Sequence, residues 1–255
     1  MITLIKLELR KILFKKRILL ALTGSLFLSF ISIRAFSLKE TYADIFSKSY
    51  GLVPLMGLIM FMMFSGSYTA EYNSNMSVLI KTTKNGKKEI VLAKSIAAGL
   101  GATITNLLIF LTVCLSALTK YKFSGLNLPI KSLWYFDKCT SNITVIQMIF
   151  IMILTITIWS FFFAQIGLFL SSISNSATIP FIFGGLIMGI PYLLEGFLKG
   201  IGFAKYLSFT PLWGMMSCQL VRYKTTSLTF IILTIIFLLG TILLPRFTLK
   251  AFVKE

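Results

Sequence analysis

Residues 139–194 read CTSNITVIQMIFIMILTITIWSFFFAQIGLFLSSISNSATIPFIFGGLIMGIPYLL and contain no charged side chain. A membrane-crossing helix needs about 20 predominantly apolar residues, so this stretch is too long for one span and long enough for two. The polar run SSISNSAT at residues 171–178, followed by Pro180 in the first turn of the next helix, is typical of a tight turn. The stretch therefore predicts two membrane helices, at about 143–170 and 178–195.

The rest of the chain divides in the same way. Further uncharged runs predict four more spans, at about 18–37, 51–70, 93–119 and 226–245. The composition agrees, since 56% of the 255 residues are hydrophobic and only 13% are charged. We therefore predict an all-α integral membrane protein with six transmembrane helices, in which residues 1–255 form one membrane domain.

The N-terminal segment, residues 1–17, alternates apolar and basic positions at helical spacing. Its basic side chains include Lys6, Arg10 and Lys11. We predict an amphipathic elbow helix in the cytoplasmic interface, with a simple charged anchor for the first span as the alternative. Because basic residues favour the cytoplasmic side, both chain termini are predicted to be cytoplasmic.

Residues 196–224 are too interrupted by Lys199, Lys205 and Pro211 to span a membrane. We predict short interfacial helices on the outer face, with Tyr206 and Trp213 at the level of the lipid headgroups. A plain outer loop is the alternative.

The net charge of +17 lies mainly at the ends of the apolar runs, which favours contact with anionic lipid over nucleic acid. The chain has no histidine and only three cysteines without CxxC spacing, so neither a metal nor a redox site is expected. We also expect no ionisable residue well inside a span, which argues against ion-coupled transport and membrane-embedded catalysis. Gly86 and Lys87 lack the remainder of a P-loop. The chain is therefore predicted to be no enzyme, and energy for any transport must come from another polypeptide.

A lysine-rich stretch, residues 71–90, separates the second and third predicted spans. As a helix, its apolar side chains would line one face and its lysines another, and Asn85 with Gly86 would end it. This pattern predicts a cytoplasmic helix that docks on a partner, with an ordinary basic loop as the alternative. The apolar face would consist of Met76, Leu79, Ile80 and Thr83, and the polar face of Ser77, Lys81, Lys84 and Lys88.

The same stretch resembles the membrane subunits of ABC-2 type transporters, whose pattern here runs E-Y-x-x-G-T-x-x-x-L-L-x-T-P-x-S-R-x-x-I-x-x-x-K. The matching positions are Glu71, Tyr72, Leu79, Ile80, Thr83, Lys87, Ile90 and Lys94. Asn75, Met76 and Lys84 depart from the family's usual glycine, threonine and proline. The elbow helix, the six spans and the sequence KYLSFTPLWG before the last span extend the resemblance to the whole chain.

The resemblance implies a permease subunit of a bacterial plasma-membrane exporter. It implies no cofactor on this chain, ATP and Mg²⁺ on two copies of a separate cytoplasmic ABC ATPase, and a second permease copy in a homodimer. The elbow helix would lie beside the ATPase contact. That contact would comprise Glu71, Tyr72, Met76, Leu79, Ile80, Thr83, Lys84, Lys87 and Lys88.

The apolar, Phe- and Met-rich spans favour an amphipathic or hydrophobic substrate, such as a peptide, a bacteriocin or a drug, in export or self-immunity. Export of sodium or another small solute is an alternative. From another class, a non-transporting scaffold or sensor could recruit a soluble partner through the same basic helix. The substrate-binding residues, the direction of transport and a heterodimeric assembly are not determined by the sequence.

Overall fold

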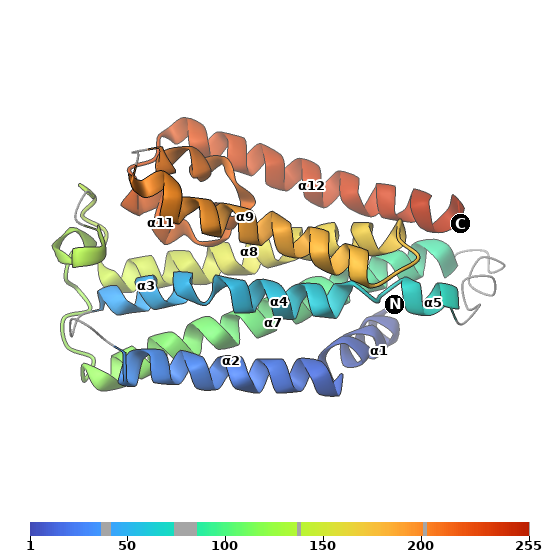
Figure 1. Cartoon of the computed structure of the whole chain (residues 1–255), viewed down its shortest axis with the longest axis horizontal. Helices are drawn as coiled ribbons and strands as arrows, with labels where there is room; N and C mark the ends of the chain where they lie inside the picture. The colour runs from blue at the N-terminus through green and yellow to red at the C-terminus, as the bar shows by residue number, and fades with distance from the viewer. Residues whose placement is uncertain (37–41, 74–85, 137–138, 201–202, 255) are drawn as a thin grey trace.

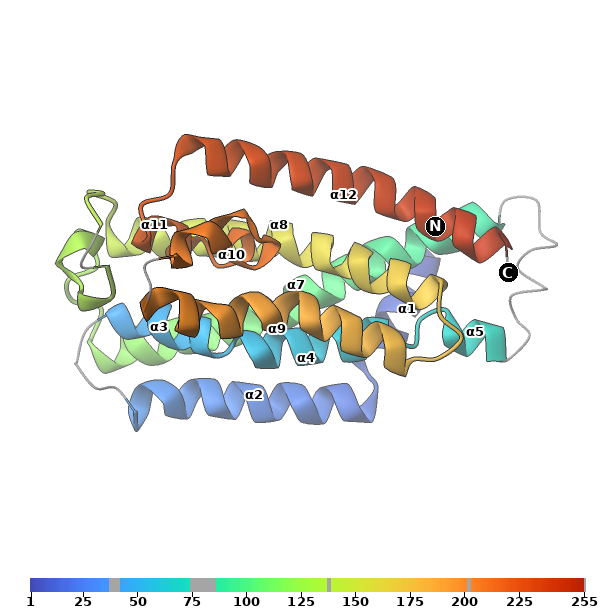
Figure 2. The same ribbon diagram turned by 45° about the horizontal axis from the view of Figure 1, so that its top comes forward.

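The computed structural model describes residues 1–36, 42–73, 86–136, 139–200 and 203–254, and these fold into an elongated helical bundle (Figure 1). Within these ranges there is no β-strand, and strand-like pairing is limited to an isolated bridge between Pro129 and Thr144. Both chain termini lie at the same end of the bundle, which we call the terminal end (Figures 1 and 2). The helices α10 and α11 lie at the opposite end.

Six of the described helical segments are long and apolar enough to cross a membrane. The described chain is thus consistent with an all-α, multi-pass membrane protein, as predicted. The second segment is interrupted and consists of α4 and α5. The helices are α2 (Lys16–Arg34), α4 (Val53–Phe64) with α5 (Thr69–Asn73), α7 (Gly86–Lys120), α8 (Val145–Ser172), α9 (Thr178–Gly200) and α12 (Ser227–Lys254).

The predicted turn in the long uncharged stretch is confirmed. Helix α8 starts at a capping box, in which the Thr144 hydroxyl accepts from the Gln147 backbone N–H and the Gln147 side chain accepts from the Thr144 N–H. It ends at Ser172, and α9 begins at Thr178 with Pro180 in its first turn. Local chain chemistry therefore sets both boundaries.

The core lies where α4, α7 and α8 meet. Gly99 on α7 lets α8 approach closely, because a Cβ there would lie 2.3 Å from Cδ1 of Phe161. In mid-bundle, the Asn106 amide donates to the Ser160 hydroxyl over 2.9 Å, which joins α7 to α8. In contrast, the most apolar windows of α9 and α12 are only 17% and 11% buried. These two helices present most of their surface to whatever surrounds the bundle.

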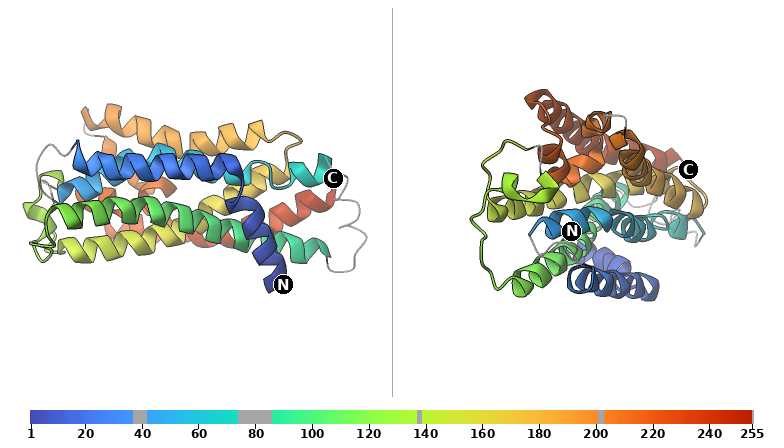
Figure 3. Two further views of the ribbon diagram at one scale, coloured as in Figure 1. Left: turned by 90° about the horizontal axis from the view of Figure 1, so that it is seen from below. Right: turned by 60° about the vertical axis from the view of Figure 1, so that its left-hand side comes forward.

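Helix α1 (Ile2–Leu13) forms a separate helix that meets α2 at an angle (Figure 3). Part of its predicted apolar face packs on α7, where a Cβ on Gly101 would lie within 4 Å of both Leu9 and Ile12. Ile12 is buried, whereas Ile2 is 83% exposed. The protein therefore covers much of the face that the sequence assigned to the membrane interface.

The second span is preceded by a short helix that the sequence did not reveal, α3 (Ala43–Gly51). Its Asp44 is buried and accepts a hydrogen bond of 3.4 Å from the Tyr121 hydroxyl at the far end of α7. A buried carboxylate is costly unless it is hydrogen-bonded, and the Tyr121 hydroxyl supplies such a bond to Asp44.

The predicted interfacial segment 196–224 instead inserts into the bundle from the opposite end. Its described part contains η3 (Ala204–Phe209), α10 (Pro211–Met215) and α11 (Ser217–Arg222). The hydroxyl of Thr155, about 15 Å along α8 at 1.5 Å per residue, donates to the Met215 carbonyl over 3.2 Å and lies 3.0 Å from the Ser217 hydroxyl. This depth places the segment well inside the bundle.

The Trp213 side chain does not face lipid headgroups, because it is 0% exposed and packs inside the protein. The physical reason is close helix packing, because a Cβ on the neighbouring Gly214 would lie 2.4 Å from the Trp159 ring. Tyr206, the other predicted headgroup residue, is 56% exposed. An ion pair between Arg222 and Glu195, 3.4 Å long, closes the segment against α9.

Candidate functional site

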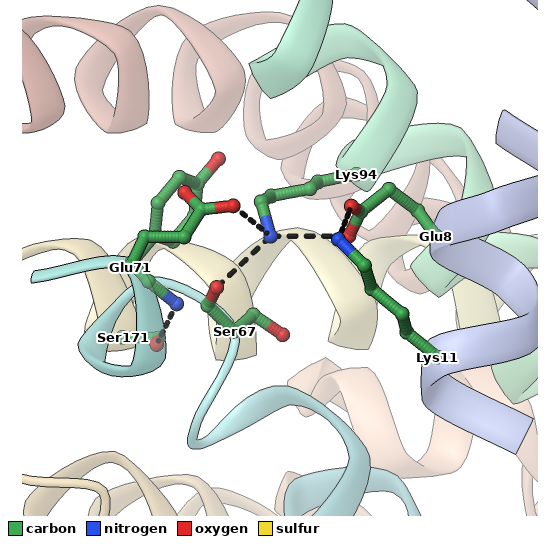
Figure 4. Close-up of polar contacts among 7 residues, drawn as sticks. Glu8, Lys11, Ser67, Glu71, Lys94 and Ser171 are labelled. Carbon is green, nitrogen blue, oxygen red and sulfur yellow. Dashed lines mark hydrogen bonds and ion pairs between the residues drawn. The ribbon is translucent and has the colours of Figure 1, made fainter. Parts of the chain in front are cut away.

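A buried ionic cluster lies at the terminal end, centred on Lys94 of α7 (Figure 4). The Lys94 ammonium is 2.9 Å from Glu71 Oε1 and 3.1 Å from Glu8 Oε2. It also donates to the Ser67 carbonyl over 2.9 Å. A buried lysine normally carries a large desolvation cost, and these three oxygens offset it. We call Glu8, Ser67, Glu71 and Lys94 the Lys94 cluster.

Each partner comes from a different element. Glu8 lies on the face of α1 that packs against α7, and Lys11, one turn on, pairs with its other oxygen at 2.6 Å. Glu71 lies in the first turn of α5, where the helix dipole favours an acid. Ser67 lies in the turn between α4 and α5. The cluster therefore ties the first helix, this turn and α7 together.

The turn before α5 is held to α8 by three hydrogen bonds. The Tyr68 N–H donates to the Ser171 hydroxyl over 3.2 Å, and that hydroxyl donates to the Ser65 carbonyl over 3.1 Å. The Tyr72 hydroxyl donates to the Ser172 carbonyl over 3.0 Å. These bonds fix the position of Glu71 relative to α8.

Aromatic rings extend the cluster to the last helix. The buried Tyr68 ring lies 5.4 Å from the Lys94 ammonium, within cation–π range. Phe252 of α12 packs against Tyr68 at 5.3 Å and stacks on Tyr72 at 6.0 Å between ring centroids. The cluster and its rings thus join α1, α5, α7, α8 and α12.

The charges in the cluster compensate one another. Burial by itself raises the pKa of Glu8, but the Lys94 and Lys11 ammonium groups outweigh burial and hold this pKa below its usual value. Glu8 is therefore ionised at neutral pH. Two carboxylates face the ammonium groups of Lys94 and Lys11, and this balance stabilises charges that would be costly singly.

A cleft of about 580 Å³ opens beside the cluster, between α1 and the turn that leads into α5. Glu8, Lys11, Glu71 and Lys94 all contribute to its lining. Over the described ranges there is no group of three or more His, Cys, Asp or Glu side chains that could hold a metal ion. The arrangement can fix α1, α5 and α7 relative to one another, and its ion pairs can weaken or break when a charge is added or removed nearby.

The predicted contact residues fall into two sets. The Glu71 and Tyr72 side chains point into the protein. Glu71 forms an ion pair with Lys94, and the Tyr72 hydroxyl donates a hydrogen bond to α8. Lys87 and Lys88 lie in the first turn of α7, half-buried and exposed respectively. Gly86 begins α7, so residues 86–90 of the predicted coupling segment belong to the third long helix. Met76, Leu79, Ile80, Thr83 and Lys84 lie outside the described residues.

The elbow residues Lys6, Arg10 and Lys11 are all exposed, and Lys11 pairs with Glu8 of the cluster. The sequence did not indicate that Lys94, near the start of α7, would be buried, yet its side chain is 4% exposed. Glu8 was missed as well. Two sequence features could have indicated the cluster. Lys94 is a lone lysine at the start of an apolar run, and Glu8 is a lone acid on the basic N-terminal helix.

The fold defines a class: an all-helical chain with six candidate membrane spans among its described residues and an interhelical ionic cluster at one end. No family model, curated protein or solved structure matches the chain.

Proposed function

We propose that this chain is the permease subunit of an ATP-driven exporter and that a separate ATPase binds at the terminal end. The observation that carries the proposal is the Lys94 cluster. It joins Glu71, at the start of the predicted coupling stretch, to the elbow helix through Glu8 and to a long helix through Lys94. The predicted ATPase contact and the elbow helix, which the resemblance places beside it, are thus linked by one buried group.

This linkage suits the transmission of a conformational change. A partner that displaces α5 acts on α7 through Lys94, on α8 through the Tyr72 hydroxyl and on α12 through Phe252. Discrete ion pairs of this kind can form in one state and break in another. The role of Glu71 would then be to position the docking stretch rather than to contact the ATPase directly.

The arrangement of the bundle supports the predicted topology. An even number of spans returns the chain to its starting side, and both termini lie at the terminal end (Figure 1). We propose that this end is cytoplasmic and that the host membrane is a bacterial plasma membrane. The exposed faces of α9 and α12 leave room for lipid and for a second copy of the chain.

We propose an amphipathic or hydrophobic cargo, such as a peptide or a lipophilic drug. The large side chains exposed on the outward faces of the spans are predominantly apolar, and the charges of the Lys94 cluster are paired with one another at the terminal end. This surface suits a cargo that partitions into the membrane.

The test is to purify the tagged chain from its native membranes in mild detergent and photolabel it with 8-azido-ATP and Mg²⁺. We expect a separate co-purifying chain to be labelled, and its ATP turnover to change when this subunit is present in lipid vesicles. Replacing Leu79 and Ile80 with aspartate should release the labelled chain, whereas Lys131→Ala, at an exposed site on the opposite side, should not. Absence of a labelled partner would overturn the proposal, and a partner without ATP turnover would indicate a scaffold.

A further inference from the structure

A second cleft, of about 530 Å³, lies at the corner where α1 passes into α2. We call it the elbow cleft. It lies next to the cleft beside the Lys94 cluster, and the two share Lys15 and Gly66. Its lining residues are Lys15, Lys16, Arg17, Ile18, Met62, Ser65, Gly66 and Ala177.

In the part of the chain that the structure describes, no carboxylate forms an ion pair with the cations of the elbow cleft, although Glu8 attracts Lys15 at longer range. Three of its lining residues are cations and none is an acid. Among the described residues, the side chains of Lys15, Lys16 and Arg17 form no ion pair and no hydrogen bond. Lys94 and Lys11, by contrast, are both paired with carboxylates. A free anion at this corner would therefore meet unpaired positive charge.

The other walls of the cleft are apolar or small. Ile18 is 2% exposed, and Met62 and Ala177 come from α4 and from the turn before α9. Directly beyond the cleft, Leu20 on α2 is 70% exposed and Ile179 on α9 is 51% exposed. Basic groups at one edge and exposed apolar side chains along the adjoining helices match a molecule with an anionic head and hydrocarbon tails.

We propose that the elbow cleft binds the phosphodiester headgroup of an anionic phospholipid, with the acyl chains running along α2 and α9. Lys16 and Arg17 occupy the first turn of a candidate membrane span, which is the depth at which headgroups lie. An arginine guanidinium can donate two parallel hydrogen bonds to a phosphate, and the lysines add charge. A free phosphate would gain nothing from the apolar side chains, which favours the lipid as the source of the anion.

The bound lipid would also support the neighbouring cluster. It would neutralise Lys15, which lines both clefts, and reduce the repulsion between the ammonium groups of Lys15 and Lys94. The inference depends on membrane insertion of the chain and not on a partner ATPase. A negative result would therefore leave the proposed transport function untouched.

The test uses the full chain in detergent, with native mass spectrometry to count bound phosphatidylglycerol against phosphatidylcholine. The variant Lys16→Ala/Arg17→Ala should bind phosphatidylglycerol about 30-fold more weakly, because each basic residue near an anionic surface contributes about 1 kcal/mol. The control Lys199→Ala/Lys205→Ala removes the same charge from exposed positions at the opposite end and should change the affinity less than about 3-fold.

Competition with inorganic phosphate separates the two sources of the anion. We expect millimolar phosphate to leave phosphatidylglycerol bound, and its displacement would overturn the lipid assignment. The proposal also fails if the wild-type chain holds both lipids equally, or if the Lys16/Arg17 variant and the control lose the same affinity. Circular dichroism of each variant checks that helix content is unchanged.

Discussion

Replacing Lys94 with methionine provides the most direct test of the ionic cluster. The substitution keeps the length and apolar stem of the side chain and removes only the ammonium. Glu71 then loses its 2.9 Å ion pair and Glu8 its 3.1 Å pair, while both carboxylates stay largely buried. Buried charges without a counterion are strongly destabilising.

The expected loss of unfolding free energy in Lys94→Met depends on which ion pairs of Glu8 and Glu71 remain. Breaking a buried ion pair by removing one partner costs about 3–5 kcal/mol. Glu8 keeps Lys11 at 2.6 Å, so we expect the lower end, about 3 kcal/mol. For a chain of this size that corresponds to a Tm lower by about 6–12 °C.

The assay is thermal unfolding in detergent, followed by tryptophan fluorescence. A triple variant, Lys94→Met with Glu8→Gln and Glu71→Gln, should recover most of the loss, because no buried carboxylate is left unpaired and Lys11, which loses its partner, is exposed. The control Lys131→Met removes an exposed lysine that donates to Asn142, and should change stability by less than about 0.5 kcal/mol. An unchanged Tm for Lys94→Met would show that the cluster does not stabilise the fold.

Three further predictions concern other parts of the chain. Because the pKa of Glu8 is lowered in the fold, its stabilising contribution is complete above the ordinary value of 4.5 and is lost as pH falls through the folded value; Tm measured from pH 6 to pH 3 should show this loss, and Glu8→Gln should abolish it. Gly184→Ala should lower the unfolding free energy by about 1–3 kcal/mol, because the new Cβ would lie 2.1 Å from the Phe61 ring of α4. Gly185→Ala, where the added Cβ meets open space, should be neutral or stabilising. Equal denaturation midpoints for the two variants would contradict this packing. Tyr223→Phe removes a 2.6 Å hydrogen bond to Glu195 and should lower the unfolding free energy by about 1.5 kcal/mol, with no change arguing against that bond.

The long helices could be predicted because bilayer-length apolar runs are a local property of the chain. Residues 139–194 needed only their missing charges and the serine-rich turn to predict α8 and α9. Helix α3 and the inserted segment around Trp213 could not be predicted in this way. Their burial depends on partners distant in sequence, such as Tyr121 for Asp44 and Trp159 for Gly214.

The candidate site was predicted only in part for the same reason. Glu71 was singled out from its place in the stretch between two spans, and the structure gives it a buried partner. Lys94 was named only as a match to the family pattern at the start of an apolar run, and nothing in its local sequence indicated that its side chain would be buried. Only the fold brings Glu8, 86 positions away, to the same ammonium.

The length of α7 has a mechanical consequence. With 35 residues it extends about 52 Å, well beyond a hydrocarbon core of about 30 Å. Helix α8 approaches it closely at Gly99, which divides the helix into arms of about 20 Å and about 32 Å at 1.5 Å per residue. Gly99 would therefore act as the fulcrum of a lever. A sideways displacement of the start of α7, at Gly86, would swing its far end, at Lys120, about 1.6 times as far in the opposite direction.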